Sequence, residues 1–226
     1  MDSRLTPGPL AATARTRLRR LPGKEVTDTA TLHAVLDAGR VAHVAVTQGG
    51  QPFVLPVAYA RDSDRVVLHG STGSRLFRAL AAGTPCCVTV TILDGLVLAR
   101  SAFETSMNYR CAMVLGVPSI VDGEAKVGAL YRISEHVQPG RWAQVREPNA
   151  KELAKTLVVA LSLDECSVKV SAVWPDDEPA DLDRPVWAGV VPVHETFGDP
   201  VPAPDLRFDV PPPTFTTSPR PTPRAG

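Results

Sequence analysis

The feature that most constrains the fold is a series of short apolar stretches joined by tight turns. Residues 41–47, 53–60 and 65–70 are each rich in β-branched and aromatic side chains. The two connections, Gln48-Gly49-Gly50 and Asp62-Ser63-Asp64, have the residue types of hairpin turns. Strands that follow one another through such short turns are expected to pair antiparallel, because a parallel pair needs a long crossover.

The stretch 53–60 has an unusual pattern, because both of its faces are apolar. Phe53 and Leu55 alternate with Val54 and Pro56, and the alternation continues to the end of the stretch. Side chains of a strand point alternately to its two faces, so both faces of this strand must be covered. We therefore expect it to lie between the core and a second element, either a partner subunit or a cofactor.

The remaining segments also favour strands over helices. Residues 86–101 and 109–117 predict further strands, with Asp94-Gly95 marking a bulge or a turn, and residues 156–163 and 167–174 predict a final hairpin. Short helices are expected after Asp28 or Thr29, after Ser74, after Asp122 and at 150–155. Six or seven strands with three or four short helices predict a mainly β (α+β) fold, and closure into a small antiparallel barrel would remove exposed strand edges. A doubly wound α/β fold is disfavoured.

The composition changes towards both ends of the chain. Of 22 prolines, 13 lie from Pro175 onwards, and residues 209–226 are typical of a disordered Pro-rich tail. Residues 1–25 are expected to form a flexible arm, which leaves residues 26–208 as one domain. The apolar segment 186–191 is the exception within the Pro-rich region, and we expect it to fold back onto the barrel.

Charge and cysteine content exclude several classes of function. Lysine plus arginine and aspartate plus glutamate both number 24, so no net positive charge favours nucleic acid or an acidic membrane. No apolar run has the length of a signal peptide or a membrane helix, which predicts a cytoplasmic protein. The four cysteines have no metal-ligand spacing with each other or with histidine, so we expect reduced thiols and no metal site formed by them.

The stretch 66–76 is the most informative segment for chemistry. An apolar strand ends at His69, a small loop containing Gly70 and Gly73 follows, and Ser74-Arg75 begins a helix. Free N–H groups at a helix start, together with a guanidinium, favour binding of an anion such as a phosphate. The loop lacks the lysine of a nucleoside-triphosphate loop and the GxGxxG pattern of a dinucleotide fold. The alternative is an ordinary capped turn between strand and helix.

This loop resembles the one that grips the FMN phosphate in pyridoxamine 5′-phosphate oxidase-like split β-barrel proteins. The chain is similar in particular to the flavin-nucleotide-binding and nitroimidazole-reductase-like branch of that family, over about residues 15–208. Besides the loop, four segments in the same order carry the resemblance, and they are residues 94–103, 106–110, 139–142 and 186–190.

The resemblance implies a homodimer with FMN at the subunit interface, bound by the domain 26–208. It implies ring contacts from the backbone of Leu55, Pro56 and Val57, phosphate contacts from Ser74 and Arg75, and His69 beside the flavin pocket. Three further residues, Asn108, Tyr109 and Arg110, would approach the same cavity, and Lys169 or Trp187 would complete it from the partner chain. The alternative roles are packing for Trp187 and a structural ion pair with Glu104 for Arg110.

The sequence also departs from the branch near this pocket. Glu104 and Thr105 stand where relatives have histidines, Cys111 stands in place of serine, and Ser171 in place of an arginine. The loss of one cation and two imidazoles implies weaker binding of an anionic cofactor or a different substrate.

The leading hypothesis is an FMN-dependent oxidoreductase that acts on an unidentified small molecule, with NAD(P)H as a possible electron donor. No nucleophile or acid/base pair stands out, in keeping with a site where the cofactor performs the redox step. The alternatives are a protein that binds a flavin or haem without turnover, with His69 as the plausible axial ligand, and a family member that has lost its cofactor. The deazaflavin coenzyme of related split barrels is an alternative to FMN.

Overall fold

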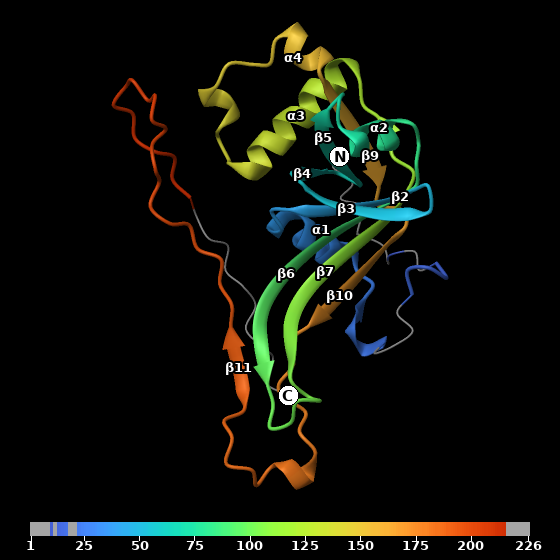
Figure 1. Cartoon of the computed structure of the whole chain (residues 1–226), viewed down its shortest axis with the longest axis vertical. Helices are drawn as coiled ribbons and strands as arrows, with labels where there is room; N and C mark the ends of the chain where they lie inside the picture. The colour runs from blue at the N-terminus through green and yellow to red at the C-terminus, as the bar shows by residue number, and fades with distance from the viewer. Residues whose placement is uncertain (1–9, 11–12, 18–21, 216–226) are drawn as a thin grey trace, which may run out of the picture. The chain divides into compact units, whose positions relative to one another are not determined.

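The structure is a computed structural model that describes residue 10 and residues 13–17 and 22–215 (Figure 1). These residues form eleven β-strands and four α-helices. The chain divides into two compact units, the first made of residues up to 92 together with 109–171, and the second of residues 93–108 together with those from 172 onwards. No helix of the described part is long and apolar enough to span a membrane.

The first unit contains most of a seven-stranded sheet, in which six strands follow the order β1-β10-β7-β6-β2-β3. Its strands are β1 (Glu25–Val26), β2 (Ala42–Gln48), β3 (Gln51–Val57), β6 (Cys86–Leu98), β7 (Ser106–Gly116) and β10 (Cys166–Ser171). The β2–β3 hairpin confirms the predicted turn, because Gly49 and Gly50 both have positive φ, at 57° and 77°.

A second antiparallel sheet has the order β4-β5-β9-β8. It contains β4 (Tyr59–Asp62), β5 (Arg65–Ser71), β9 (Thr156–Ser162) and β8 (Ser119–Ile120). The predicted antiparallel fold with few helices is confirmed. The strands of the described residues form two hydrogen-bonded sheets, however, and do not close into one continuous barrel.

Two predicted strand assignments were wrong because the chain passes from one sheet to the other. The stretch 53–60 is interrupted after Val57, and the buried hydroxyl of Tyr59 donates hydrogen bonds to the carbonyls of Leu36 at 2.6 Å and Gly39 at 3.1 Å. The predicted final hairpin of 156–163 and 167–174 does not form, since β9 pairs with β5 and β8 while β10 pairs with β7 and β1.

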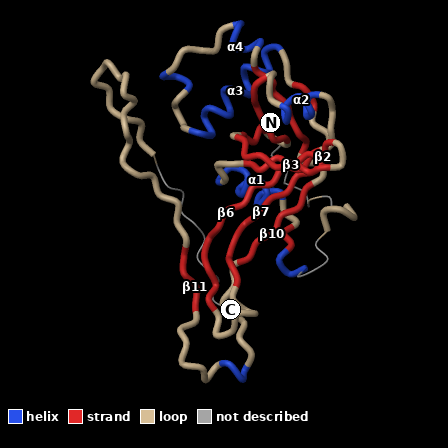
Figure 2. Tube along the Cα trace, viewed as in Figure 1, coloured by secondary structure: helices blue, strands red, loops and turns tan. Residues whose placement is uncertain are grey.

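Two apolar clusters pack against the second sheet. The larger cluster includes residues of α1 (Thr29–Ala38) and α2 (Arg75–Ala81), and the smaller one includes residues of α3 (Gly123–Val137). Strand β5 contributes to both, because Val66 and Leu68 belong to the larger cluster and Val67 to the smaller one. Figure 2 shows α3 beside this sheet, and α4 (Ala150–Ala154) precedes β9.

The second unit contains the outer parts of β6 and β7 together with β11 (Gly189–Pro192), which pairs with residues 95–98 of β6. Strand β6 continues through Asp94 and Gly95, so this pair does not form a turn. A Cβ atom at Gly95 would lie 3.1 Å from the carbonyl oxygen of Val191, which explains the need for glycine at this close approach. Residues 189–191 of the apolar segment 186–191 thus pair with β6, whereas packing of the segment onto a barrel stays a prediction.

The predicted boundaries of the arm, domain and tail stay a prediction, since much of residues 1–25 and 209–226 lies outside the described residues. Within the arm, Thr16 is buried, and the guanidinium of Arg15 pairs with the carboxylate of Glu165.

We expect Tyr59→Phe to destabilise the protein by about 1–3 kcal/mol, because the carbonyl of Leu36 would lose its buried hydroxyl donor, while that of Gly39 keeps a contact with Nε2 of His136 at 2.7 Å. Urea unfolding measures this, with Tyr131→Phe as the control because Tyr131 is exposed on α3. An equal free energy of unfolding for both variants would contradict the role assigned to the Tyr59 hydroxyl.

Candidate functional site

The sequence-predicted site residues do not form one group in the structure. All of them except Asn108 and Trp187 lie in the first unit. Within that unit they occupy three places, which are the start of α2 with strand β3, the β7–β10 strand pair, and a cavity lined by His69.

Arg75 lies against the β2–β3 hairpin. Its Nε donates to Oε1 of Gln48 at 2.6 Å, and its guanidinium carbon lies 3.9 Å from the ring centroid of Phe53. Ser74 is the N-cap of α2, and its hydroxyl accepts from the backbone N–H of Phe77 at 3.4 Å. The predicted cap is therefore confirmed, and the cation is held over the strand that carries the predicted ring-contact residues.

Those ring-contact residues, Leu55, Pro56 and Val57, lie on β3 at the edge of the first sheet. Phe53 and Val57 lie on one face of the strand and pack against the larger apolar cluster, although Leu55 on the same face is 47% exposed. The opposite face, with Val54 at 58% exposed and Pro56 also exposed, is open within the described chain. No element of the described chain covers this open face. A ligand or a partner chain could therefore cover it, as the sequence predicts.

Tyr109, Arg110 and Lys169 lie on the neighbouring strands β7 and β10. Lys169 has its ammonium group 5.7 Å from the ring centroid of Tyr109, and Arg110 is opposite Val170. Ser171, opposite Tyr109, is buried and accepts a hydrogen bond from Nζ of Lys24 at 3.0 Å. A lysine from the N-terminal segment thus supplies positive charge where the family pattern has an arginine.

The two candidates of the second unit differ in exposure. The buried amide of Asn108 donates to the carbonyl of Val173 at 2.8 Å and accepts from its N–H at 2.9 Å, which holds strand β7 to the segment after β10. Trp187 is 64% exposed, and its ring lies 3.0 Å from the place of a Cβ atom at Gly189. Contacts of either residue with a cofactor stay predictions, as does the ion pair between Arg110 and Glu104.

His69 lines a cavity of about 610 Å³ between β5, α3 and the segment up to β9. Strand alternation explains its position, because His69 follows Val67 by two residues and so shares the face that α3 covers. The other ten candidate residues, all of them described, do not line this cavity. Its apolar lining consists of Ala58, Leu130, Ile133, Val137, Trp142 and Pro148, and its polar lining of His69, Ser134, Gln138, Arg141, Arg146, Glu152 and Thr156.

The imidazole of His69 is not a satisfied core histidine. Its Nδ1 is buried and has no hydrogen-bond partner among the described residues, an arrangement that costs free energy in a purely structural side chain. Burial also lowers the pKa of His69 below the usual value for histidine. The ring is therefore neutral at pH 7 and retains a lone pair that a metal ion could accept.

A short turn fixes Arg141 on the exposed side of the cavity. The carboxylate of Glu135 accepts hydrogen bonds from the backbone N–H groups of Gly140 at 2.6 Å and Trp142 at 2.9 Å. These two donors lower the pKa of Glu135, and Gly140 has the positive φ of 78° that the turn requires. Arg141 itself donates to Oε1 of Gln144 at 3.2 Å.

Sequence reasoning missed most of this cavity. Arg141 and Trp142 were noted only as part of a resembling segment, and the residues of α3 carried no ligand-like spacing. The alternation of β5 together with the amphipathic pattern of α3 was the one usable signal, and it indicates packing rather than a cavity.

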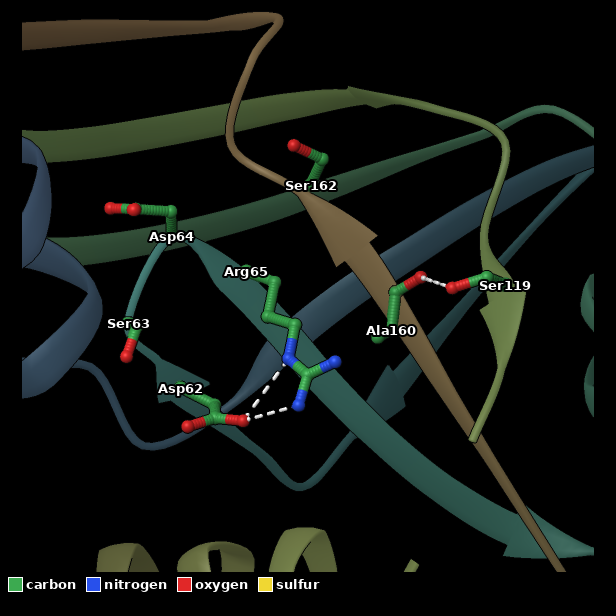
Figure 3. A pocket seen from close by; sticks show the side chains of 7 residues that line it. All are labelled: Asp62, Ser63, Asp64, Arg65, Ser119, Ala160 and Ser162. Atoms are coloured by element: carbon green, nitrogen blue, oxygen red, sulfur yellow. Dashed lines mark hydrogen bonds and ion pairs between the residues drawn. The ribbon is translucent and has the colours of Figure 1, made fainter. Parts of the chain in front are cut away.

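A second cavity, of about 460 Å³, lies beside the β4–β5 turn (Figure 3). Asp62 accepts hydrogen bonds from Nε and Nη2 of Arg65, at 3.1 and 2.7 Å, and pairs with Nε of Arg132 at 2.6 Å. Ser119 donates to the carbonyl of Ala160 at 3.4 Å. These polar groups satisfy one another, so we assign no ligand to this cavity.

Comparison with known proteins identifies the family. The family model for pyridoxamine 5′-phosphate oxidase matches residues 28–170. The FAD and haem binding protein from Mycobacterium smegmatis is 43% identical, with a TM-score of 0.80, over 84% of this chain and 94% of that one. The chain therefore belongs to the pyridoxamine 5′-phosphate oxidase family, and the resemblance inferred from the sequence is confirmed.

A second solved structure covers still more of the chain. The flavocytochrome Anf3 from Azotobacter vinelandii is 40% identical, with a TM-score of 0.83, over 91% of this chain and 96% of that one. A 5-nitroimidazole antibiotic resistance protein from Bacteroides thetaiotaomicron shares the fold at 20% identity and a TM-score of 0.53, over 65% of this chain and 86% of that one. No curated protein sequence matches the chain.

The lowered pKa of His69 predicts a pH-dependent stability. The unfolded state takes up a proton near the usual histidine pKa, whereas the folded state does so only at lower pH, so acidification below about pH 6.5 favours unfolding. The free energy of unfolding of the wild type should therefore fall more steeply between pH 7 and 5 than that of His69→Gln. Parallel pH profiles in urea titrations would contradict the burial of a neutral imidazole.

Proposed function

We propose that this protein is a flavin- and haem-binding redox protein, with haem in the His69 cavity and the flavin beside Arg75. Two relatives at 43% and 40% identity, one described as an FAD and haem binding protein and one as a flavocytochrome, support the proposal. The observation that carries it is the half-buried imidazole of His69, which lines the cavity and whose Nδ1 has no hydrogen-bond partner among the described residues. His69 is also the axial ligand that the sequence predicts for a haem-binding protein.

The residues of the cavity fit a haem. A volume of about 610 Å³ lies within the range of small-molecule sites, and most of the surface that the walls expose to the cavity is apolar, as a porphyrin ring requires. His69 supplies the neutral imidazole, and Arg141 supplies a cation on the exposed side for a carboxylate. Haem, when bound, supplies one-electron redox chemistry, and the protein tunes it through the axial ligand and the polarity of the walls.

The residues around Arg75 fit the phosphate-bearing part of a flavin. The guanidinium is exposed at the surface and has a neutral partner, Gln48, so its charge is available to an anion. Leu55, which shares a face of β3 with the Phe53 ring under the guanidinium, is 47% exposed, and a second copy of the chain would complete the site as in the predicted homodimer. The relative described as an FAD and haem binding protein favours FAD over the FMN and deazaflavin expected from the sequence.

A flavin, when bound, would accept a hydride and release single electrons, so a protein that holds both a flavin and a haem would link a two-electron donor to a one-electron acceptor. NAD(P)H as the donor and a small molecule as the acceptor are part of this proposal. Mass spectrometry of the molecules released on denaturation separates FAD, FMN and deazaflavin. Purified protein that is colourless and takes up neither added flavin nor added haem would contradict the proposal.

We expect His69→Ala to lose the axial ligand and with it the visible absorption bands of a histidine-ligated haem. Absorption spectra of the reduced and oxidised protein after addition of haem measure this. His194→Ala serves as the matched control, because His194 is exposed and lies outside the cavity. An unchanged spectrum for His69→Ala would assign the ligand role to another residue.

We expect Arg75→Ala to weaken flavin binding about tenfold or more, the effect of losing one charge-assisted hydrogen bond. Flavin retained after gel filtration and a fluorescence titration measure the change. Arg78→Ala is the control, because Arg78 is an exposed arginine on the same helix. Equal flavin content in both variants would exclude the phosphate role of Arg75.

A further inference from the structure

We propose that Glu152 is an internal competitor for ligand carboxylates, which holds Arg146 while the cavity is empty and releases it to a carboxylate of the bound ligand. This inference rests on the proposed function, because it takes haem, with its two carboxylates, as the ligand. It assigns unequal roles to the two arginines of the cavity, with Arg141 available from the outset and Arg146 available only after exchange.

The first observation is the geometry of the pair. Both side chains line the cavity, and the guanidinium of Arg146 binds the carboxylate of Glu152 with two parallel contacts, Nη1 to Oε2 at 2.8 Å and Nη2 to Oε1 at 2.5 Å. This is the arrangement by which an arginine binds a carboxylate of any source. Glu152 thus occupies the position that a ligand carboxylate would take on Arg146.

The second observation is that Glu152 is held in place independently of Arg146. It forms a capping box with Asn149, in which its Oε2 accepts from the N–H of Asn149 at 2.9 Å and its own N–H donates to Oδ1 of Asn149 at 3.0 Å. The hydrogen bonds from Arg146 and Asn149 lower the pKa of Glu152 to about 2. When Arg146 moves away, the hydrogen bond from the N–H of Asn149 still holds the carboxylate beside the cavity, and at pH 7 a glutamate stays charged even at its ordinary pKa of about 4.3.

The third observation is that the ion pair is open to water. The side chain of Arg146 is 69% exposed and that of Glu152 is 44% exposed. Ion pairs in such surroundings are weak, because water screens the charges and the side chains lose freedom on pairing. A ligand carboxylate that is anchored elsewhere in the cavity can therefore replace the carboxylate of Glu152.

Arg141 differs from Arg146 in each of these respects. It has no carboxylate partner among the described residues, and its guanidinium donates instead to the neutral amide of Gln144. Its backbone turn is fixed by Glu135. One carboxylate of the ligand then binds Arg141, for which no other carboxylate competes among the described residues. The second carboxylate binds Arg146 only by displacing the carboxylate of Glu152, whose negative charge also repels it.

The test is a titration of the full-length protein with ferric protoporphyrin IX and, as an uncharged probe, its dimethyl ester. Glu152→Gln is the main variant, because a glutamine preserves the capping box and removes only the charge. We expect it to bind the dicarboxylate about twofold to fivefold more tightly than the wild type. Binding of the dimethyl ester should stay unchanged.

Two further variants complete the test. Arg146→Gln should weaken binding of the dicarboxylate, because it removes the cation released to the ligand and leaves the charge of Glu152 without its arginine partner, and Glu152→Gln combined with Arg146→Gln should lose the gain of Glu152→Gln. Arg141→Gln should weaken binding of the dicarboxylate and leave the ester unaffected. Circular dichroism confirms that the variants keep the fold, and Glu152→Ala provides a second removal of the charge.

The outcomes distinguish failure of the proposed competition by Glu152 from failure of the proposed haem binding. If Glu152→Gln and Glu152→Ala bind the dicarboxylate no better than the wild type, or improve the ester equally, the competition is excluded while haem binding stands. If the wild type binds neither porphyrin, the proposed function fails, and the inference fails with it. A gain that depends on both Arg146 and the ligand carboxylates supports the inference.

Discussion

A β-strand has only two faces, and β5 buries both of them. Val66 and Leu68 pack into the larger apolar cluster, while Val67 packs under α3 in the smaller one. Because side chains alternate between the two faces of a strand, His69, two positions after Val67, must also face α3. Beside α3, the sheet borders a cavity at this point, and the imidazole of His69 lines it. Its Nδ1 has no hydrogen-bond partner among the described residues.

The two proposed cofactor places use positive charge differently. Arg75 is exposed, rests on the ring of Phe53 and has a neutral partner in Gln48, which suits an anion that approaches from solvent or from a partner chain. Arg141 instead stands on a turn whose backbone N–H groups are bound by Glu135, beside a largely apolar space. A single chain thus offers one surface cation for a phosphate and one cation beside a cavity for a carboxylate.

Local signals predicted much of the fold, because the turns and caps are determined by neighbouring residues. The glycine pair of the β2–β3 turn and the Ser74 cap are examples. The interruption before Tyr59 could not be predicted, since apolar alternation continues through it and its cause is a hydroxyl that reaches backbone carbonyls of Leu36 and Gly39. The separation of β9 and β10 into different sheets likewise depends on partners distant in the sequence.

The candidate site was predicted less well for the same reason. His69 is visible at the end of an apolar strand, but the residues that make its surroundings a cavity come from α3 and the segment that follows it. Their contribution depends on the position of the helix over the sheet and on the Glu135 turn, and neither leaves a local pattern. Lys24, which reaches Ser171 from before β1, was hidden because its partner lies at the other end of the domain in sequence.

The origin of the cavity wall has a consequence for how such proteins diverge. Apart from Ala58 and His69, every lining residue comes from one continuous segment, residues 130–156, which is attached to the sheet mainly through α3 and β9. Substitutions, insertions or deletions in this segment would reshape the space in front of the imidazole while both sheets keep their strand order. Evolution can therefore exchange the occupant of this cavity, or eliminate it, without rebuilding the scaffold that carries Arg75.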